Sequence, residues 1–296
     1  MKLVVGPGSV NLGKRVSDLM GCDLVPLVWK LFPDGESYVR LGSALKDESV
    51  VLIQSTSPPQ DKRLMELFFL VRLIKSFDIR DLVVVIPYLA YMRQDKRFLD
   101  GEVVSVEVIG RILGSLGVEK LVFVDVHSDG VLDFFDGSVK AVSAFPLIGD
   151  YLSKLDLVDA FVLAPDAKAF RYAKVVSSRL GVPSDFLVKS RDRVTGEVKT
   201  DVKRLDVAER DVVIVDDMIS TGGTIVNAVS ILGQLGARRV FAACTHGLFV
   251  DGASIRLMGA GVYDVIATDT VESFYSKVSV APVLMEAIRS LADDFE

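Results

Sequence analysis

The sequence predicts an α/β fold in which parallel strands are connected by helices. Short runs of β-branched and other apolar residues recur along the chain, most clearly at 50–53, 82–86, 121–124 and 212–215. Longer segments with the apolar spacing of a helix separate these runs. Strands that alternate with helices form parallel sheets, because each helix returns the chain to the same end of the sheet. Uninterrupted Val and Ile runs also suit strands that helices cover on both faces.

An internal repeat indicates that the fold contains two α/β units. Ile-Leu-Gly-Ser-Leu-Gly at 112–117 is echoed by Ile-Leu-Gly-Gln-Leu-Gly at 231–236, and each segment ends an expected helix before an apolar run. Fifteen positions lead from the first Ile of each segment to one of the two histidines, His127 and His246. A chance match is the alternative, but the shared context favours duplication. We therefore expect an N-terminal domain over 1–145, a C-terminal domain over 146–283, and a final helix over 284–296 that packs back on the N-terminal domain.

Composition excludes several classes of function. Half of the 296 residues (50%) are hydrophobic, so the chain can bury large cores. The 34 basic and 40 acidic residues give 34 − 40 = −6, and the basic ones are scattered, so we expect neither nucleic acid nor a membrane as a partner. No apolar run reaches the roughly 18 residues that a membrane-spanning helix needs. Cys22 and Cys244 lie in apolar surroundings and no secretory signal precedes MKLVVG, which favours a cytoplasmic location.

In such sheets, ligands bind in the loops where strands end and helices begin. The first of these loops, Gly8–Lys14, has the spacing of a phosphate-binding P-loop up to its lysine. Arg15 follows, where that motif needs Ser or Thr to ligate Mg²⁺. We therefore interpret Ser9 or Asn11 as the start of a helix.

A later loop has stronger signals for a phosphate ligand. Asp216 and Asp217 follow the apolar run 212–215, and hydroxyl and glycine residues come next, before a helical segment. Glycine allows the backbone to approach a ligand, and the start of a helix attracts anions. The alternative is an ordinary helix start beside two solvated acids, but adjacent acids at the end of a buried strand are costly unless they bind something. The predicted phosphate-binding turn consists of Ser220, Thr221, Gly222, Gly223 and Thr224.

This loop resembles the phosphoribosyl-pyrophosphate (PRPP) motif of type I phosphoribosyltransferases and of ribose-phosphate pyrophosphokinases, the PRPP synthases. The rest of the chain resembles the synthases, over essentially its full length, whereas ordinary phosphoribosyltransferases are shorter, single-domain chains. The resemblance implies two similar type I phosphoribosyltransferase-like domains, each with a central, mainly parallel sheet flanked by helices. The matching segments are FPDGE at 32–36, YMRQDKR at 91–97, DVHS at 125–128, APD at 164–166, KSR at 189–191, THGLF at 245–249 and VSVAP at 278–282.

The resemblance also implies a reaction that feeds nucleotide biosynthesis. The β,γ-diphosphate of ATP moves to O1 of ribose 5-phosphate, which gives PRPP and AMP. Lys189 would stabilise the transition state and Arg191 would assist it. Both belong to the charge-dense segment Lys189–Arg204, whose composition suggests a mobile lid; without the resemblance, a solvated surface loop would be the better interpretation. Mg²⁺ is the expected cofactor, held by His127 and Asp166, although a lone histidine at a strand end is more often structural. We interpret His246 as structural.

Both substrates have expected binding residues. The turn Ser220–Thr224 would hold the 5-phosphate with help from Arg191, while Asp216 and Asp217 would accept hydrogen bonds from the ribose hydroxyls, directly or through Mg²⁺. Taken alone, 32–36 is only a Pro-Asp-Gly turn; in the family it reaches ATP from a neighbouring subunit, which implies a homo-oligomer with a shared ATP site. The expected ATP-binding residues are Phe32, Asp34, Gly35, Glu36, Arg93, Gln94 and Asp95.

Two other functions stay open at this point. A phosphoribosyltransferase that consumes PRPP would keep 216–224 but would have no reason for Arg93, His127 and Lys189 at synthase positions. A non-catalytic, nucleotide-binding regulatory homologue would be expected to have lost some of these residues, and none is lost. Ser220, where many relatives have Asp, and the stretch SDGVLDFF after His127 resemble archaeal members of the family more than bacterial ones.

Overall fold

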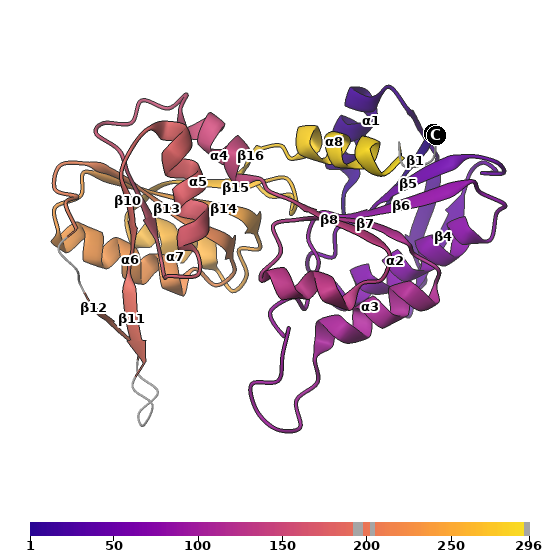
Figure 1. Ribbon diagram of the computed structural model, residues 1–296, viewed down its shortest axis with the longest axis horizontal. Helices are drawn as coiled ribbons and strands as arrows, with labels where there is room; N and C mark the ends of the chain where they lie inside the picture. Colours follow the sequence, from indigo (N-terminus) through magenta and orange to yellow (C-terminus); the bar gives the residue numbers. More distant parts are fainter. Residues whose placement is uncertain (192–197, 202–204, 293–296) are drawn as a thin grey trace. The chain divides into compact units, whose positions relative to one another are not determined.

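The computed structural model describes residues 1–191, 198–201 and 205–292; for 188–191 and 198–201 it describes the backbone only. The chain forms two compact units (Figure 1). The N-terminal unit contains Met1–Ser143 and the C-terminal segment from Ser279, and the C-terminal unit is Ala144–Val278. Two sheets flanked by helices confirm the predicted α/β class.

In the N-terminal unit, six parallel strands form one sheet of order β2-β1-β5-β6-β7-β8. A separate antiparallel hairpin, β3–β4, follows β2 in the chain. The strands are β1 (Lys2–Val5), β2 (Asp23–Leu24), β3 (Leu27–Leu31), β4 (Ser37–Leu41), β5 (Ser49–Ile53), β6 (Asp81–Ile86), β7 (Lys120–Val124) and β8 (Ser138–Val142). The helices are α1 (Val10–Met20), α2 (Gln60–Lys75), α3 (Ser105–Ser115), the short 3-10 helix η1 (Asp129–Phe134) and α8 (Ala281–Ala292).

The C-terminal unit has a second parallel sheet, of order β10-β9-β13-β14-β15-β16. A separate antiparallel pair, β11–β12, follows β10 in the chain. The strands are β9 (Phe161–Ala164), β10 (Ser184–Phe186), β11 (Val188–Arg191), β12 (Val198–Asp201), β13 (Asp211–Ile219), β14 (Arg239–Gly247), β15 (Val262–Thr268) and β16 (Ser276–Val278). The helices are α4 (Phe145–Leu152), α5 (Phe170–Leu180), α6 (Gly223–Gln234) and α7 (Ala253–Gly259).

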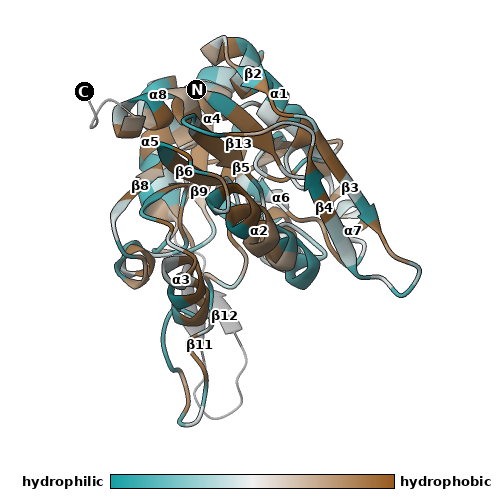
Figure 2. Cartoon of the chain, turned by 90° about the vertical axis from the view of Figure 1, so that its right-hand side faces the viewer, coloured by the Kyte–Doolittle hydropathy of each residue, from teal (hydrophilic) through white to brown (hydrophobic). Residues whose placement is uncertain are grey.

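Alternate residues of the buried strands face opposite layers of helices. On β13, Ile214 belongs to a core with Leu232 of α6, whereas its neighbour Val213 belongs to a core with Val176 of α5. Successive side chains of a strand point to opposite faces, so an uninterrupted apolar run is buried on both. Figure 2 shows β9 and β13 as mostly brown, hydrophobic strands. The N-terminal unit follows the same plan, with α2 and α3 on one face of its core and α8 packed against α1 and the strands β6, β7 and β8.

The two sheets have the same topology. In each unit, strands taken in chain order lie in the order 2-1-3-4-5-6, and an antiparallel hairpin precedes the third. This order makes β14 the counterpart of β6, whereas the sequence echo pairs β14 with β7. The equal spacing to the two histidines therefore does not make His246 the structural counterpart of His127. The echo reflects a shared local structure instead: a helix end followed by a glycine with positive φ, Gly117 at 78° and Gly236 at 80°.

At the amino end of β13, a buried carboxylate connects segments of the C-terminal unit that are distant in the chain. Asp211 is 0% exposed and accepts hydrogen bonds from Arg238 Nε (3.0 Å), Arg239 Nη2 (2.6 Å) and the N–H of Val158 (2.8 Å). Burial raises the pKa of Asp211, but hydrogen bonds from Arg239 and Arg238 outweigh it and hold this pKa well below its ordinary value of 3.8. Asp211 therefore stabilises the fold above pH 3.8, and this contribution is lost as pH falls through the lowered pKa.

Asp211→Asn is expected to lower the free energy of unfolding by about 2 kcal/mol at pH 7. Loss of one partner of a buried ion pair costs more, but here both guanidinium groups keep contact with water. Thermal unfolding of both proteins from pH 7 to pH 3 measures the difference, which should shrink below pH 3.8. Asp206→Asn is the control, because Asp206 pairs with Arg210 at the surface and is 96% exposed. An equal loss in both variants would contradict the role given to Asp211.

Among the described residues, no helix combines the length and apolar character needed to cross a lipid bilayer.

Candidate active site

Three acidic residues lie at the carboxyl edge of the C-terminal sheet. Asp216 and Asp217 belong to the last part of β13, and Asp166 follows β9, which pairs with β13. The N–H of Asp217 donates to Asp216 Oδ1 (2.9 Å), and the N–H of Met218 donates to Asp217 Oδ1 (2.8 Å). Asp166 Oδ1 accepts the N–H groups of two residues just before α5, each at 3.1 Å. Backbone hydrogen bonds therefore fix the direction of all three carboxylates.

The local electrostatics favour a ligand that brings positive charge or hydrogen-bond donors. Burial raises the pKa of Asp216 well above its ordinary value, and the neighbouring charges of Asp217 and Asp166 raise it further. Asp217 itself is buried, with 7% of the residue exposed. A cation or a pair of sugar hydroxyls would relieve this repulsion.

The carbonyl groups of the turn after β13 are hydrogen-bonded to the segment 248–250. The carbonyl of Ile219 accepts the N–H groups of Leu248 (2.9 Å) and Phe249 (3.1 Å), and that of Ser220 accepts the N–H of Val250 (3.1 Å). Because C=O and N–H point in opposite directions across a trans peptide, the N–H groups of Ser220 and Thr221 face away from the segment 248–250. The first N–H groups of α6 also lack partners within the helix, as at any helix start. Together these donors form a suitable site for an anion.

Glycine is required inside this turn. Gly222 has a φ of 79° and precedes the first residue of α6. A Cβ at Gly222 would lie 3.3 Å from Leu257 of α7. At Gly223 a Cβ would meet nothing within 4 Å, so space for a ligand is open there.

Arg256 is a residue of this site that sequence reasoning missed. Arg256 belongs to α7, and its Nη2 (2.9 Å) and Nε (3.2 Å) donate to the carbonyl of Thr221. The same peptide argument turns the N–H of Gly222 outward. Arg256 thus orients the turn, a role that depends on how α7 packs and that leaves no local pattern.

In the N-terminal unit, the segment Phe32–Glu36 forms the exposed tip of the β3–β4 hairpin. The N–H of Phe32 donates to the carbonyl of Glu36 (2.8 Å), and Gly35, with a φ of 96°, closes the turn. Asp34 accepts the N–H of Glu36 (3.2 Å). Phe32 is 41% exposed, and its ring touches that of Tyr38 edge-on at 5.8 Å between centroids. An exposed aromatic ring beside acceptors suits a purine base.

The loop after β6 places Arg93, Gln94 and Asp95 beside the loop after β7. Ser128 Oγ donates to Asp95 (2.6 Å), so the residue next to His127 is tied to this segment. Gln94 Nε2 donates to Glu102 (3.2 Å), and Arg93 is exposed. Two predicted segments, 91–97 and 125–128, are therefore neighbours in space.

Other predicted residues are placed less completely. Lys189 and Arg191 belong to β11, but their side chains lie outside the described residues, as do 192–197 and 202–204 of the predicted lid. His127 and Asp166 belong to different units. No group of three or more His, Cys, Asp or Glu side chains in the described part of the chain is arranged to hold a metal ion by itself. His246 is 2% exposed, and its Nδ1 is hydrogen-bonded to Thr270 Oγ1 (2.9 Å), as suits a structural residue.

Two family models match the two halves of the chain. The N-terminal domain of ribose phosphate pyrophosphokinase matches residues 1–117, and the phosphoribosyl transferase domain matches residues 146–280. The second match contains the acidic residues and the turn described above.

Curated relatives and a solved structure match over nearly the full length. The ribose-phosphate pyrophosphokinase of Saccharolobus solfataricus is 41% identical over 271 residues, 91% of this chain and 93% of the relative. That of Methanothermobacter thermautotrophicus is 40% identical over 97% of this chain and 100% of the relative. The crystal structure of phosphoribosylpyrophosphate synthetase from Mycobacterium smegmatis is 30% identical, with a TM-score of 0.88 over 99% of both chains.

Proposed function

The chain belongs to the ribose-phosphate pyrophosphokinase family, and on that premise we propose how its residues divide the work. The reaction of the family transfers the β,γ-diphosphate of ATP to O1 of ribose 5-phosphate and gives PRPP and AMP. One observation carries the assignment of residues. A turn whose N–H groups face away from the segment 248–250 follows the half-buried Asp216 and the buried Asp217. This arrangement suits a ligand that has a phosphate at one end and hydroxyls at the other.

Ribose 5-phosphate binds at this turn with a defined polarity. Ser220, Thr221, Gly222, Gly223 and Thr224 cradle the 5-phosphate with their N–H groups and hydroxyls. Asp216 and Asp217 accept hydrogen bonds from the ribose hydroxyls, directly or through a metal ion. The carboxylates repel the phosphate, so the sugar lies in one orientation with O1 turned toward the incoming diphosphate.

ATP binds at the hairpin tip and at the loop after β6. Phe32 stacks on the adenine, and Asp34 and Glu36 accept from its amino group, with Gly35 shaping the tip. Arg93 and Gln94 supply donors, with Asp95 holding their loop to Ser128. The tip is exposed and belongs to a hairpin outside the six-stranded sheet, which supports a homo-oligomer in which the hairpin completes the ATP site of a neighbouring subunit.

Members of this family need a metal ion, and we propose Mg²⁺ held by His127 and Asp166. The Asp166 carboxylate fits, because Mg²⁺ usually takes one or two carboxylates and completes its shell with water and substrate phosphates. His127 would contact the ion directly or through one of its waters. The surplus negative charge at Asp216, Asp217 and Asp166 also favours a cation. When bound, the ion would neutralise charge on the phosphates and hold them together.

Lys189 and Arg191 complete the catalytic assignment. Their positive charges stabilise the charge that develops as the diphosphate leaves AMP, and Arg191 also contacts ribose 5-phosphate. We place the reaction in the cytoplasm, where ATP is available and where Cys22 and Cys244, both free thiols in the structure, stay reduced.

One assay tests the proposed function against its alternatives. Purified protein is incubated with ATP, Mg²⁺ and ribose 5-phosphate, and AMP and PRPP are measured together. Equal amounts of both are expected. Formation of ADP in place of AMP would indicate an ordinary kinase, and nucleotide binding without turnover would indicate a regulatory homologue.

A further inference from the structure

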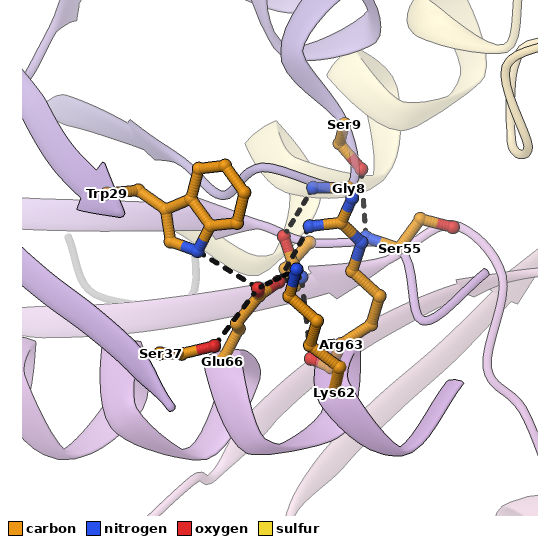
Figure 3. A network of polar contacts seen from close by, with 9 residues as sticks. Gly8, Ser9, Trp29, Ser37, Ser55, Lys62, Arg63 and Glu66 are labelled. Atoms are coloured by element: carbon orange, nitrogen blue, oxygen red, sulfur yellow. Dashed lines mark hydrogen bonds and ion pairs between the residues drawn. The ribbon is translucent and has the colours of Figure 1, made fainter. Parts of the chain in front are cut away.

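A fully buried carboxylate in the N-terminal unit connects the β3–β4 hairpin to helix α2. Glu66 of α2 is 0% exposed. Its Oε1 accepts a hydrogen bond from Trp29 Nε1 (2.9 Å) on β3 and a longer one from Ser37 Oγ (3.4 Å) on β4. Figure 3 shows both side chains reaching Glu66 from the hairpin. One carboxylate thus contacts both strands of the hairpin.

The charge of Glu66 is balanced from its own helix. Arg63 Nη1 donates to Oε2 (2.7 Å), and Lys62 Nζ lies 4.0 Å from Oε1. The buried amide of Gln54 donates to Oε2 at 3.5 Å. A buried carboxylate is tolerated only when paired in this way. Oε2 of Glu66 is therefore paired with Arg63 and Gln54, while Oε1 accepts the hydrogen bonds from the hairpin.

Trp29 is held by more than its hydrogen bond. The Nζ of Lys62 lies 4.9 Å from its ring centroid, and the guanidinium carbon of Arg63 lies 5.9 Å from it. Cations over an indole ring are attracted to its face. The same two cations that balance Glu66 thus hold the ring of Trp29.

The hairpin depends on side-chain contacts for its direction. It forms a two-stranded sheet of its own and shares no backbone ladder with the six-stranded sheet. Isolated two-stranded hairpins are marginally stable. Leu27 and Leu41 anchor the base of the hairpin in the core, whereas Leu31, next to the tip, is 44% exposed. Trp29 lies between base and tip, in register with Val39, which also packs against the core. Its hydrogen bond to Glu66 adds a polar contact at this level that constrains the direction of the tip.

We propose that Glu66 is a positioning residue for ATP: through Trp29 and Ser37 it fixes the orientation of the tip Phe32–Glu36 on which the adenine stacks. The proposal rests on the ATP-binding role given to the tip above. It assigns to a buried helix residue that is not itself a proposed ATP ligand a selective effect on nucleotide affinity.

Glu66→Gln tests the proposal in the full-length protein. The amide keeps an acceptor for Trp29 but loses the charge, and its NH2 group then faces Arg63. The KM for ATP is expected to rise about tenfold, the size of one charge-assisted hydrogen bond, while kcat and the KM for ribose 5-phosphate change less than twofold. Trp29 is the only tryptophan in the chain, so its fluorescence emission should also shift.

Trp29→Phe and the double variant show whether Glu66 acts through the indole. Phenylalanine keeps an aromatic ring but has no N–H donor. If the two residues act as one contact, the double variant should raise the KM for ATP no more than the larger single change does. Glu107→Gln is the matched control, because it removes a carboxylate paired with Arg111 (2.6 Å) on the exposed face of α3.

Three results would overturn the proposal: equal rises in both KM values, a fall in kcat at constant KM for ATP, or single effects that add in the double variant. Melting curves identify a variant that fails to fold, in which case Trp29→Phe alone decides through its KM for ATP. If the unaltered protein makes no PRPP, the proposed function fails by itself. Binding of a non-hydrolysable ATP analogue to Glu66→Gln then still tests the positioning role, and unchanged affinity would contradict it.

Discussion

Replacing Asp216 by Asn is expected to make the ligand-free protein more stable and the enzyme much less active. Burial and the charges of Asp217 and Asp166 raise the pKa of Asp216, so folding is penalised whenever this carboxyl is ionised. The penalty is absent below its ordinary pKa of 3.8, grows as pH rises toward the raised pKa, and is complete above it. Asn has the same shape, can still accept the N–H of residue 217, and carries no charge. Its stabilising effect should therefore vanish below pH 3.8, grow as pH rises above 3.8, and be complete only above the raised pKa of Asp216.

Activity should change in the opposite direction. An amide is a weaker acceptor for a ribose hydroxyl or a metal ion, so kcat/KM for ribose 5-phosphate should fall about 10- to 100-fold. Each kcal/mol of added stability should raise the melting temperature by about 2–4 °C, measured without ligand and metal at several pH values. Addition of Mg²⁺ should stabilise the original protein more than the variant.

Asp150→Asn controls for the loss of a negative charge in the same unit. Asp150 lies at the surface, 3.6 Å from Arg179, with a side chain that is 48% exposed. Its replacement should leave both stability and activity nearly unchanged. If kcat/KM of Asp216→Asn is unaltered, Asp216 does not bind the ribose. If the variant melts at a lower temperature than the original protein at neutral pH, the ionised Asp216 carboxylate does not destabilise the fold.

Replacing Lys189 by Ala is expected to lower kcat by about 10²- to 10³-fold, the usual loss when one charged group that stabilises a transition state is removed. The dissociation constant for ATP should change little, because the lysine is assigned to charge that develops only during transfer. Pre-steady-state measurement of AMP formation, together with equilibrium titration of an ATP analogue, separates the two effects. Comparable losses in both would assign Lys189 to binding instead of catalysis.

Lys199→Ala is the matched control, because it removes a lysine from the other strand of the same β11–β12 pair. Lys199 on β12 is in register with Ser190, the neighbour of Lys189 on β11. Removal of Lys199 takes the same charge from the adjacent strand. A large loss of kcat in the Lys199 variant as well would show that the total charge of the pair matters more than Lys189 itself.

Much of the fold could be predicted because its signals are local. The Val and Ile runs at 82–86 and 212–215 became the buried strands β6 and β13, since uninterrupted apolar runs are stable only when both faces are covered. The structure of the PRPP motif could also be predicted from its own residues. Gly222 supplies the positive φ before α6, and hydroxyl residues surround it, so the turn could be located from the sequence alone.

The sequence could not reveal which strands of the two units correspond. The echo at 112–117 and 231–236 reports a helix end and a glycine turn, which any βαβ fold needs many times. Strand order depends on hydrogen bonding between segments that are distant in the chain. This order makes β6 of the first sheet the counterpart of β14 in the second. The matching segments still identified the family, because they depend on residue identity and not on this correspondence.

By itself, the sequence determined the α/β class, the family and the loop that is proposed to bind the sugar phosphate. The tertiary structure decided which groups act together: Asp166 beside Asp216, Arg256 on the carbonyl of Thr221, and Glu66 beneath Trp29. These partners are separated by 50, 35 and 37 positions in the chain, as the differences 216 − 166, 256 − 221 and 66 − 29 show. The physical reason is that burial, charge repulsion and hydrogen bonding depend on distance in space, which a local pattern of residues does not contain.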